Sequence, residues 1–296
     1  MSQVATGTRA GRGRLMELTL AQLRLEQRNF WRNRQSATFS FGMPLMIVVL
    51  LGGLFKGGGG TVGVGGASYS SYFVAGMVGV ALLSATFVNL AISLAFQRDL
   101  LVLKRFRGTP LGAGPLFAAK VLNGVIVVVI QVAIILAIGR LAYGTAFPKN
   151  WPAFLLAILA GVCVFSMAGV AVTAFIANAD SAPAVVNLPY LALQFVSGVF
   201  FSFQNTPAWL RVVGDLFPLR WLVDTLRAGY LGLDYVHTRR VPDLIGPARG
   251  TRLAPIHVHG VHAITAMGPA YAVMAAWMGV FTFIALTRFR WEPRAG

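Results

Sequence analysis

Long uncharged apolar runs, separated by short polar segments, dominate the chain. Helices of about 20 such residues are long enough to cross the roughly 30 Å hydrocarbon core of a bilayer. Pro44, inside the first run, should kink its helix because proline removes a helical hydrogen bond. The pattern predicts an all-α membrane protein with six transmembrane helices, near residues 37–55, 72–96, 116–138, 152–176, 184–203 and 263–286.

A different pattern precedes the first span. Residues 15–36 place Met16, Leu20, Leu23 and Phe30 on one side at helical spacing, interrupted by Gln27, with charged residues on another side. This segment adjoins a membrane span, which suits an amphipathic helix that lies at the interface, although an ordinary solvated helix has the same pattern. Residues 1–14 are rich in Gly, Thr and Arg, and we predict a disordered tail.

Charge changes the picture in two ways. Only 11% of the residues are charged, against about 25% in soluble domains. The net charge of +16 comes from basic residues that flank apolar runs, so lipid headgroups account for it better than nucleic acid, which we exclude as a partner. The single cysteine, Cys163, permits no intrachain disulfide and no multi-cysteine metal site.

The distribution of Lys and Arg predicts the orientation. The segments that would share a side with residues 1–36 hold 14 basic residues, whereas the two short loops on the other side hold three. Basic residues concentrate on the cytoplasmic side. We therefore expect both termini to be cytoplasmic, with a six-span domain at 37–287, an external segment at 204–262 and a tail at 288–296.

Several signals of enzyme or ion chemistry fail. The spans carry no ionisable residue apart from Lys and Arg at their ends, which argues against a proton or sodium relay. Residues 58–63 fit G-x-G-x-x-G without the required strand and helix, and the chain has no P-loop motif. His257, His259 and His262 lack an acidic or cysteine partner nearby. We predict no catalytic residue and no metal site.

The loop after the second span is more informative. It reads Lys104-Arg105-Phe106-Arg107-Gly108-Thr109-Pro110-Leu111, a short basic helix that Gly108 and Pro110 should end. Its charges could serve only as membrane anchors. An aromatic residue within a basic patch also suits docking to an acidic soluble partner.

A second informative segment follows the fifth span. Its apolar runs of about ten residues are too short to cross, so they should re-enter or lie at the interface. Trp209, Trp221 and Tyr230 suit the headgroup level. Asp224 and Arg227 share a helix face and could form an ion pair. Such a pair could have a structural role alone.

These two segments together resemble the ABC-2 family of ATP-binding-cassette permeases. The stretch from Lys104 to Leu111 looks like the family's K-R-L-R-A-T-P-L loop. Ser197-Gly198, Pro207-x-Trp209-Leu210, Pro218-Leu219 and Asp224-x-x-Arg227 resemble its S-G…P-x-W-L…P-L…D-x-x-R pattern. The resemblance is closest to drug-efflux permeases of the daunorubicin-resistance type, and the His-containing insert near residues 234–262 departs from it.

The resemblance implies a permease subunit in a bacterial cytoplasmic membrane. Two permeases, identical or different, would pair among lipids above two separate ATPase subunits, which would bind the ATP and Mg while this chain binds no cofactor. The substrate would be a hydrophobic drug or metabolite, or a lipid-linked glycan. A secondary transporter or scaffold that needs no ATP is the alternative.

The resemblance also assigns residues to two roles. Those expected to couple the chain to the ATPases are Asp99, Lys104, Arg105, Phe106, Arg107, Gly108, Thr109 and Pro110. Those expected in the external re-entrant segment are Ser197, Gly198, Pro207, Trp209, Pro218, Asp224 and Arg227.

Overall fold

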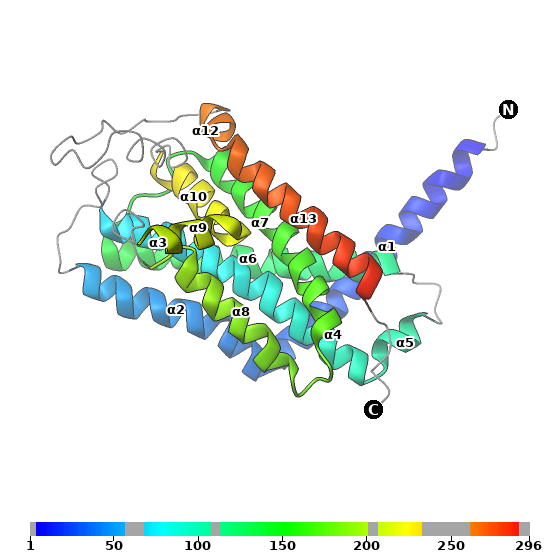
Figure 1. The fold of residues 1–296 in the computed structure, drawn as a ribbon. Coiled ribbons are helices and arrows are strands. Elements are labelled where there is room, and N and C mark those ends of the chain that lie inside the picture. Colours follow the sequence, from blue (N-terminus) through cyan, green and yellow to red (C-terminus); the bar gives the residue numbers. More distant parts are fainter. Residues whose placement is uncertain (1–3, 57–67, 108–112, 201–206, 233–260, 290–296) are drawn as a thin grey trace.

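The computed structural model describes residues 4–56, 68–107, 113–200, 207–232 and 261–289, and these form helices without a β-strand (Figure 1). The predicted all-α membrane fold is confirmed. Four stretches are long and apolar enough to cross a bilayer, at Tyr69–Asp99, Gly114–Tyr143, Trp151–Phe175 and Gly268–Arg288. Two shorter apolar helices lie at Ser40–Leu54 and Ala182–Val196. All six coincide with the predicted spans, while the count of six crossings stays a prediction.

Each of these stretches belongs to one or more helical elements. The first short helix lies within α2 (Arg34–Lys56), which continues through Pro44. The stretch from Tyr69 consists of α3 (Tyr69–Leu83), the π-helical turn η1 (Ser84–Val88) and α4 (Asn89–Asp99). The others are α6 (Ala113–Tyr143), α7 (Trp151–Val172) with the 3₁₀ turn η2 (Thr173–Phe175), α8 (Ala182–Val196) and α13 (Gly268–Arg288).

Short helices mark the two ends of the bundle. Helix α5 (Val102–Arg107) follows α4 at one end, called here the α5 end. Helices α9 (Ala208–Leu216), α10 (Pro218–Leu231) and α12 (Val261–Ala266) lie at the opposite end, called the α10 end (Figure 1). Helix α8 stops at Val196, short of the predicted limit of 203, because the chain turns at Gly198, whose φ of 72° suits glycine.

The N-terminal helix begins earlier than expected and packs on the bundle partly through polar residues. Helix α1 spans Val4–Arg32, so helix replaces most of the predicted disordered tail; extending a formed helix costs far less than nucleating one. Of the predicted apolar stripe, Met16 is 67% exposed whereas Phe30 is buried, and the place of this helix at a membrane interface stays a prediction. Gln22 and Glu26 are buried together with Phe30, and α1 packs on α6 through this mainly polar side.

The core surrounds α3, of which every residue from Tyr72 to Leu83 is buried. Helix α10 packs against α3 and α7 through close approaches at small residues. Leu222 lies against Gly161 and Val223 against Gly79, where a Cβ atom would come within 3.0 Å or less of the neighbouring side chain. Helix α10 thus enters the bundle from one end, and its 14 residues are too few to cross it.

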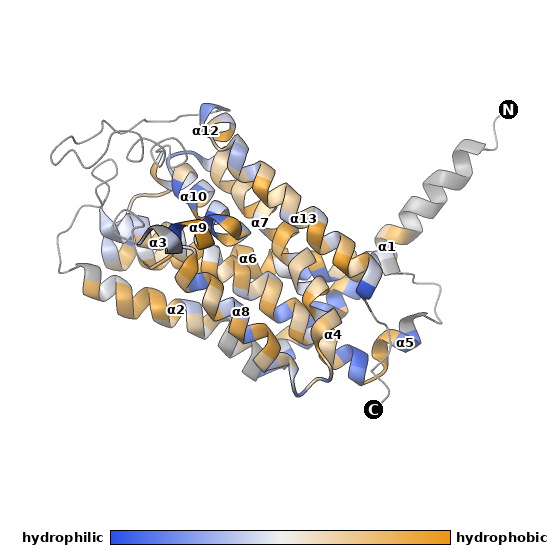
Figure 2. Ribbon diagram, in the orientation of Figure 1, coloured by the Kyte–Doolittle hydropathy of each residue, from blue (hydrophilic) through white to orange (hydrophobic). Residues whose placement is uncertain are grey.

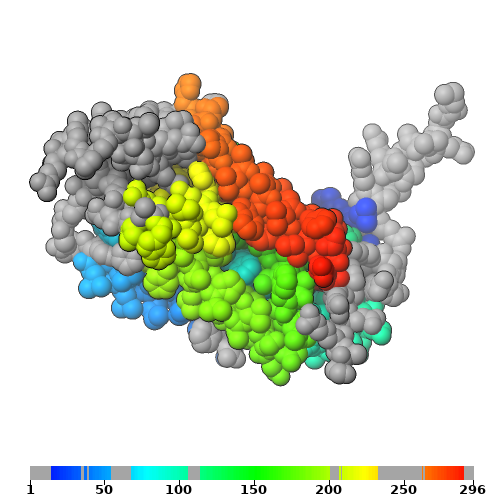
Figure 3. All heavy atoms as spheres, viewed as in Figure 1, coloured from blue at the N-terminus to red at the C-terminus, as the bar shows by residue number. Residues whose placement is uncertain are grey.

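The outer surface is apolar along the bundle, and Figure 2 shows its long helices as mainly hydrophobic. Leu50 and Leu54 on α2, Leu188 on α8, and Phe283 and Leu286 on α13 are all more than half exposed. Figure 3 shows helix α13 along the outside of the molecule, and only 11% of an apolar 18-residue stretch of this helix is buried. Such a surface suits contact with hydrocarbon, because a soluble protein rarely exposes large apolar patches.

Candidate functional site

The turn that leads into α5 has an uncommon backbone. Leu101 has a φ of 57°, and it is the non-glycine residue with positive φ among those described. A leucine in this left-handed region costs roughly 1–2 kcal/mol, so the surrounding contacts must hold it there. The Leu101 carbonyl accepts a hydrogen bond from the Arg105 amide at 3.2 Å. The turn therefore fixes where α5 leaves the end of α4.

One buried side chain anchors α5 to the bundle. Leu103 is fully buried in a small apolar cluster with Leu90 and Leu94 of α4, Leu116 of α6 and Val170 of α7. The two residues that follow Leu103, namely Lys104 and Arg105, are exposed. Helix α5 thus joins an exposed basic surface to three helices of the bundle.

Five other predicted coupling residues lie partly or wholly outside the described residues. The side chains of Phe106 and Arg107, and the whole of Gly108, Thr109 and Pro110, lie outside the described part of the structure. Helix α5 ends at Arg107, where the predicted break begins. The coupling role of this segment stays a prediction.

Two charged residues at the end of α4 bind the link between α7 and α8. The Arg98 guanidinium is buried and donates to the carbonyl oxygens of Thr173 at 3.1 Å, Ile176 at 2.9 Å and Ala177 at 3.3 Å. The predicted residue Asp99 accepts a hydrogen bond from the Ala179 amide. Sequence reasoning counted Arg98 only as a basic residue in a loop; its position directly after an apolar span was the available signal.

At the α10 end, Arg227 is the centre of a buried polar cluster. Its Nη2 donates to the carbonyl oxygens of Gly198 at 2.9 Å and Val199 at 3.2 Å, and its guanidinium carbon lies 3.4 Å from the centre of the Tyr72 ring. Asp224 and Arg227 are paired as the spacing predicted, with 4.0 Å between Oδ1 and Nη1. The carbonyl bonds are shorter, so Arg227 mainly holds the turn after α8 against α3.

The predicted residues of this segment divide into two groups. Ser197, Gly198, Pro218, Asp224 and Arg227 are all buried near the start of α3 or within α10. Two others remain outside the cluster: Pro207 precedes α9, and Trp209 is 67% exposed.

Sequence reasoning missed two residues of α3 that contact or make room for Arg227. One is Tyr72, which provides the aromatic ring and a carbonyl oxygen 3.4 Å from Arg227 Nε. The other is Gly76, where a Cβ atom would lie 3.0 Å from Arg227 Nη2 and 3.2 Å from the Val199 carbonyl oxygen. The glycine therefore leaves room for the guanidinium, a close approach that no local pattern signals.

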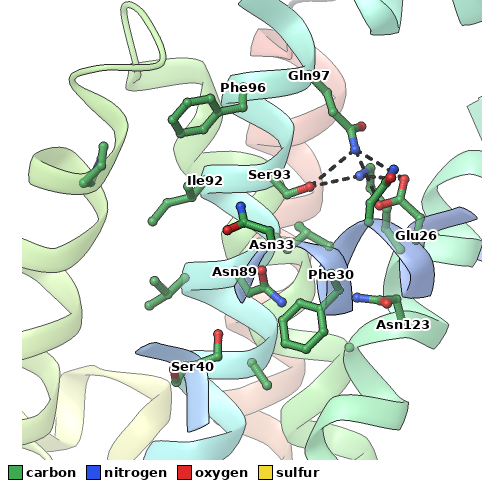
Figure 4. A pocket seen from close by; sticks show the side chains of 18 of the residues that line it. Glu26, Phe30, Asn33, Ser40, Asn89, Ile92, Ser93, Phe96, Gln97 and Asn123 are labelled. Atoms are coloured by element: carbon green, nitrogen blue, oxygen red, sulfur yellow. Dashed lines mark hydrogen bonds and ion pairs between the residues drawn. The ribbon is translucent and has the colours of Figure 1, made fainter. Parts of the chain in front are cut away.

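A cavity of about 960 Å³ opens between α1, α2, η1, α4, α6 and α8 (Figure 4). At one side Lys120 of α6 pairs with Glu26 of α1 at 3.0 Å, and both are buried. Gln97 and Ser93 of α4 complete the network with bonds of 3.4 Å to Glu26 and Lys120 respectively. The sequence showed Lys120 near a span end, but not that a carboxylate from α1 reaches it.

Metal chemistry finds no support in the described ranges. They contain no group of three His, Cys, Asp or Glu residues that could hold a metal ion. His257 and His259 lie outside those ranges, while His262 lies in α12.

Comparison with known proteins gives one family. Residues 17–231 match the family model of the ABC-2 type transporter. The match begins within α1 and ends at the last residue of α10. No curated protein matches the chain. The matched region includes the anchored helix α5, the Arg98 junction, the cavity and the Arg227 cluster. It covers well over half of the sequence, and the chain therefore belongs to the ABC-2 type transporter family.

Proposed function

We propose that this chain is the permease subunit of an ATP-binding-cassette exporter and that separate ATPase subunits drive it from the α5 end. Family membership supports the transport role. The observation that carries the coupling proposal is α5 itself, with exposed Lys104 and Arg105 on a helix whose Leu103 is fully buried. A force on this surface would act directly on α4, α6 and α7.

The Arg98 junction supports the same route. A rigid connection is needed because coupling travels through packed side chains and hydrogen bonds. Arg98 and Asp99 bind the end of α7 and the link to α8, so a shift of the α4–α5 corner would also move the start of α8. Helix α8 would thus also respond to the motion of α5, and α7 would be held at a second point.

The α10 end would be the exit. Helices α9 and α10 fill this end of the bundle without crossing it, and Arg227 holds the turn after α8 against α3. In the proposed orientation both termini are cytoplasmic and α10 faces the outside of a bacterial inner membrane. The complete exporter would contain two permeases and two ATPases, and would carry a hydrophobic drug or metabolite, or a lipid-linked substrate.

The test is co-purification from the native host. Tagged chain should retain an ATPase that hydrolyses ATP in proteoliposomes. Arg105→Glu should lower the retained ATPase at least tenfold, because it reverses a charge on the exposed face of α5. Arg140→Glu is the matched control: this arginine is also exposed, but lies near the other end of α6. Equal ATPase retention by both variants would refute docking at α5.

Coupling needs a separate measurement. Phe106→Ala should keep ATP hydrolysis while substrate transport falls, since the docking residue would no longer transmit the motion. Transport at the full rate by the purified chain alone would refute the proposal.

A second candidate, ATP-independent transport, is favoured by the buried Glu26–Lys120 pair, because buried ionisable groups in membrane proteins often serve proton relays. Uptake or efflux driven by a proton gradient in proteoliposomes without ATPase, and lost in Glu26→Gln, would establish that function instead.

A further inference from the structure

The cavity between α1, α4 and α8 has an unusual lining for a space among apolar helices. Eight asparagines occur in the whole chain, and five of them line this one cavity. Four of them lie in different helices, and Asn33 lies between α1 and α2; the five are Asn29, Asn33, Asn89, Asn123 and Asn187. Asparagine carries two donors and an acceptor without charge, so the lining offers many hydrogen bonds to a neutral group.

Three of these amides have no hydrogen-bond partner within the described residues. They are the side chains of Asn29, Asn89 and Asn187, whereas Asn123 accepts a bond from Gln27 at 2.9 Å. Asn33 and Asn89 lie close together beside Phe30, with their amides directed into the space between α1 and α4 (Figure 4). Asn89 is half-buried, while Asn29 and Asn187 are exposed, so these three amides are open to water or to a ligand.

The charges that line the cavity cancel. Among the lining residues, Glu26 carries a carboxylate and Lys120 carries an ammonium group. The two groups pair with each other at 3.0 Å. Gln97 and Ser93 occupy further bonding positions of the pair. An ionic ligand would find no free counter-charge, and breaking a buried pair to provide one leaves the other charge unpaired at a high cost.

The remaining lining is apolar. Phe30, Ile92, Phe96 and Leu191 contribute rings and aliphatic chains beside the asparagines. The volume of about 960 Å³ lies at the upper end of the range for small-molecule pockets. A ligand that fits both parts would therefore be amphipathic.

We infer that this cavity binds an uncharged amphiphile whose polar part carries several hydroxyl or carbonyl groups, such as a neutral glycoside. Asn89 of α4 and Asn187 of α8 contact the polar part, and the Glu26–Lys120 pair excludes ions. The inference that such a molecule is the transported substrate rests on the proposed function. The inference that the cavity binds it does not depend on an ATPase.

The experiment compares three probes with one fluorescent dodecyl tail and different heads: glucose, trimethylammonium or sulfate. The purified full-length chain is placed in nanodiscs free of glycoside detergent, and saturable binding is titrated. We expect the glucose probe to bind at least tenfold more tightly than either charged probe. Asn89→Leu and Asn187→Leu should each weaken it roughly three- to tenfold, the effect of losing one or two hydrogen bonds.

Two further variants keep the test decisive if a leucine variant fails to fold. Thr282→Val removes an exposed hydroxyl on α13, away from the cavity, and should leave binding unchanged. Asn89→Asp should weaken the glucose probe and strengthen the trimethylammonium probe severalfold, because it supplies the missing counter-charge.

The inference would be overturned if the unaltered chain bound a charged probe as tightly as the glucose probe. It would also be overturned if no substitution of Asn89 or Asn187 changed binding of the glucose probe. The Arg105→Glu variant separates this failure from that of the proposed function. It should bind the glucose probe normally although it retains at least tenfold less ATPase. A chain that binds the probe but never retains an ATPase refutes the function and leaves the cavity inference intact.

Discussion

Replacing Arg98 by methionine tests whether the end of α4 holds the link between α7 and α8. The buried guanidinium bonds three carbonyl oxygens, those of Thr173, Ile176 and Ala177. Methionine has a similar length and is apolar, so it removes the donors without opening a large cavity. The Asp99 carboxylate, 3.6 Å from Arg98 Nε, would also lose its cationic neighbour.

The expected loss follows from these bonds. A buried acceptor left unsatisfied costs about 1–3 kcal/mol. Local opening would let water reach part of the link, so we take the low end of that range for each carbonyl, which gives roughly 3 kcal/mol in total. At about 2–4 °C per kcal/mol, the scale for domains of roughly 150–250 residues, the Tm should fall by roughly 6–12 °C.

The assay is thermal unfolding of the detergent-solubilised chain, followed by its monodisperse fraction on size-exclusion chromatography. Arg105→Met is the matched control: it removes the same charge from the exposed face of α5 and should shift Tm by less than about 2 °C, as surface substitutions do. Arg98→Lys should fall between, since a single ammonium cannot reproduce the fork of the guanidinium. Equal Tm values for Arg98→Met and Arg105→Met would refute the structural role of Arg98.

Three further substitutions probe other contacts. Lys120→Met should destabilise the chain by about 3–5 kcal/mol because it leaves Glu26 buried and unpaired, and adding Glu26→Leu should restore most of the loss, both read from thermal unfolding. Gly229→Ala should cost about 1–3 kcal/mol, since its Cβ would lie 2.7 Å from the backbone nitrogen of Phe154; Gly279→Ala, with no atom within 4 Å, is the control that should be neutral. Leu103→Ala should cost about 2–5 kcal/mol and lower transport per ATP hydrolysed by the reconstituted exporter, because α5 loses its buried anchor.

Each has a result that contradicts it. A Glu26→Leu/Lys120→Met variant no more stable than Lys120→Met would show that the buried charge is not the cause. Equal Tm values for the two glycine variants would refute the tight approach of α10 to α7. Unchanged coupling in Leu103→Ala would show that α5 acts without its anchor.

The sequence predicted the helices because each depends on local composition. Apolar runs of sufficient length identified the spans, and the basic loop and the Pro- and Trp-containing segment led to the family that the comparison confirms. The Asp224–Arg227 pair was also local, since residues three apart share a helix face. The beginning of α1 was the local feature that sequence reasoning missed, because its glycines weaken the helical signal.

Tertiary structure decided which groups meet. Hydropathy marks polar residues as exposed, so it gave no sign that Gln22 and Glu26 of α1 are buried against other helices. The Glu26–Lys120 pair and the carbonyl partners of Arg98 and Arg227 join residues far apart in the chain. Such contacts depend on how whole helices pack, and no periodicity along one helix records the position of another.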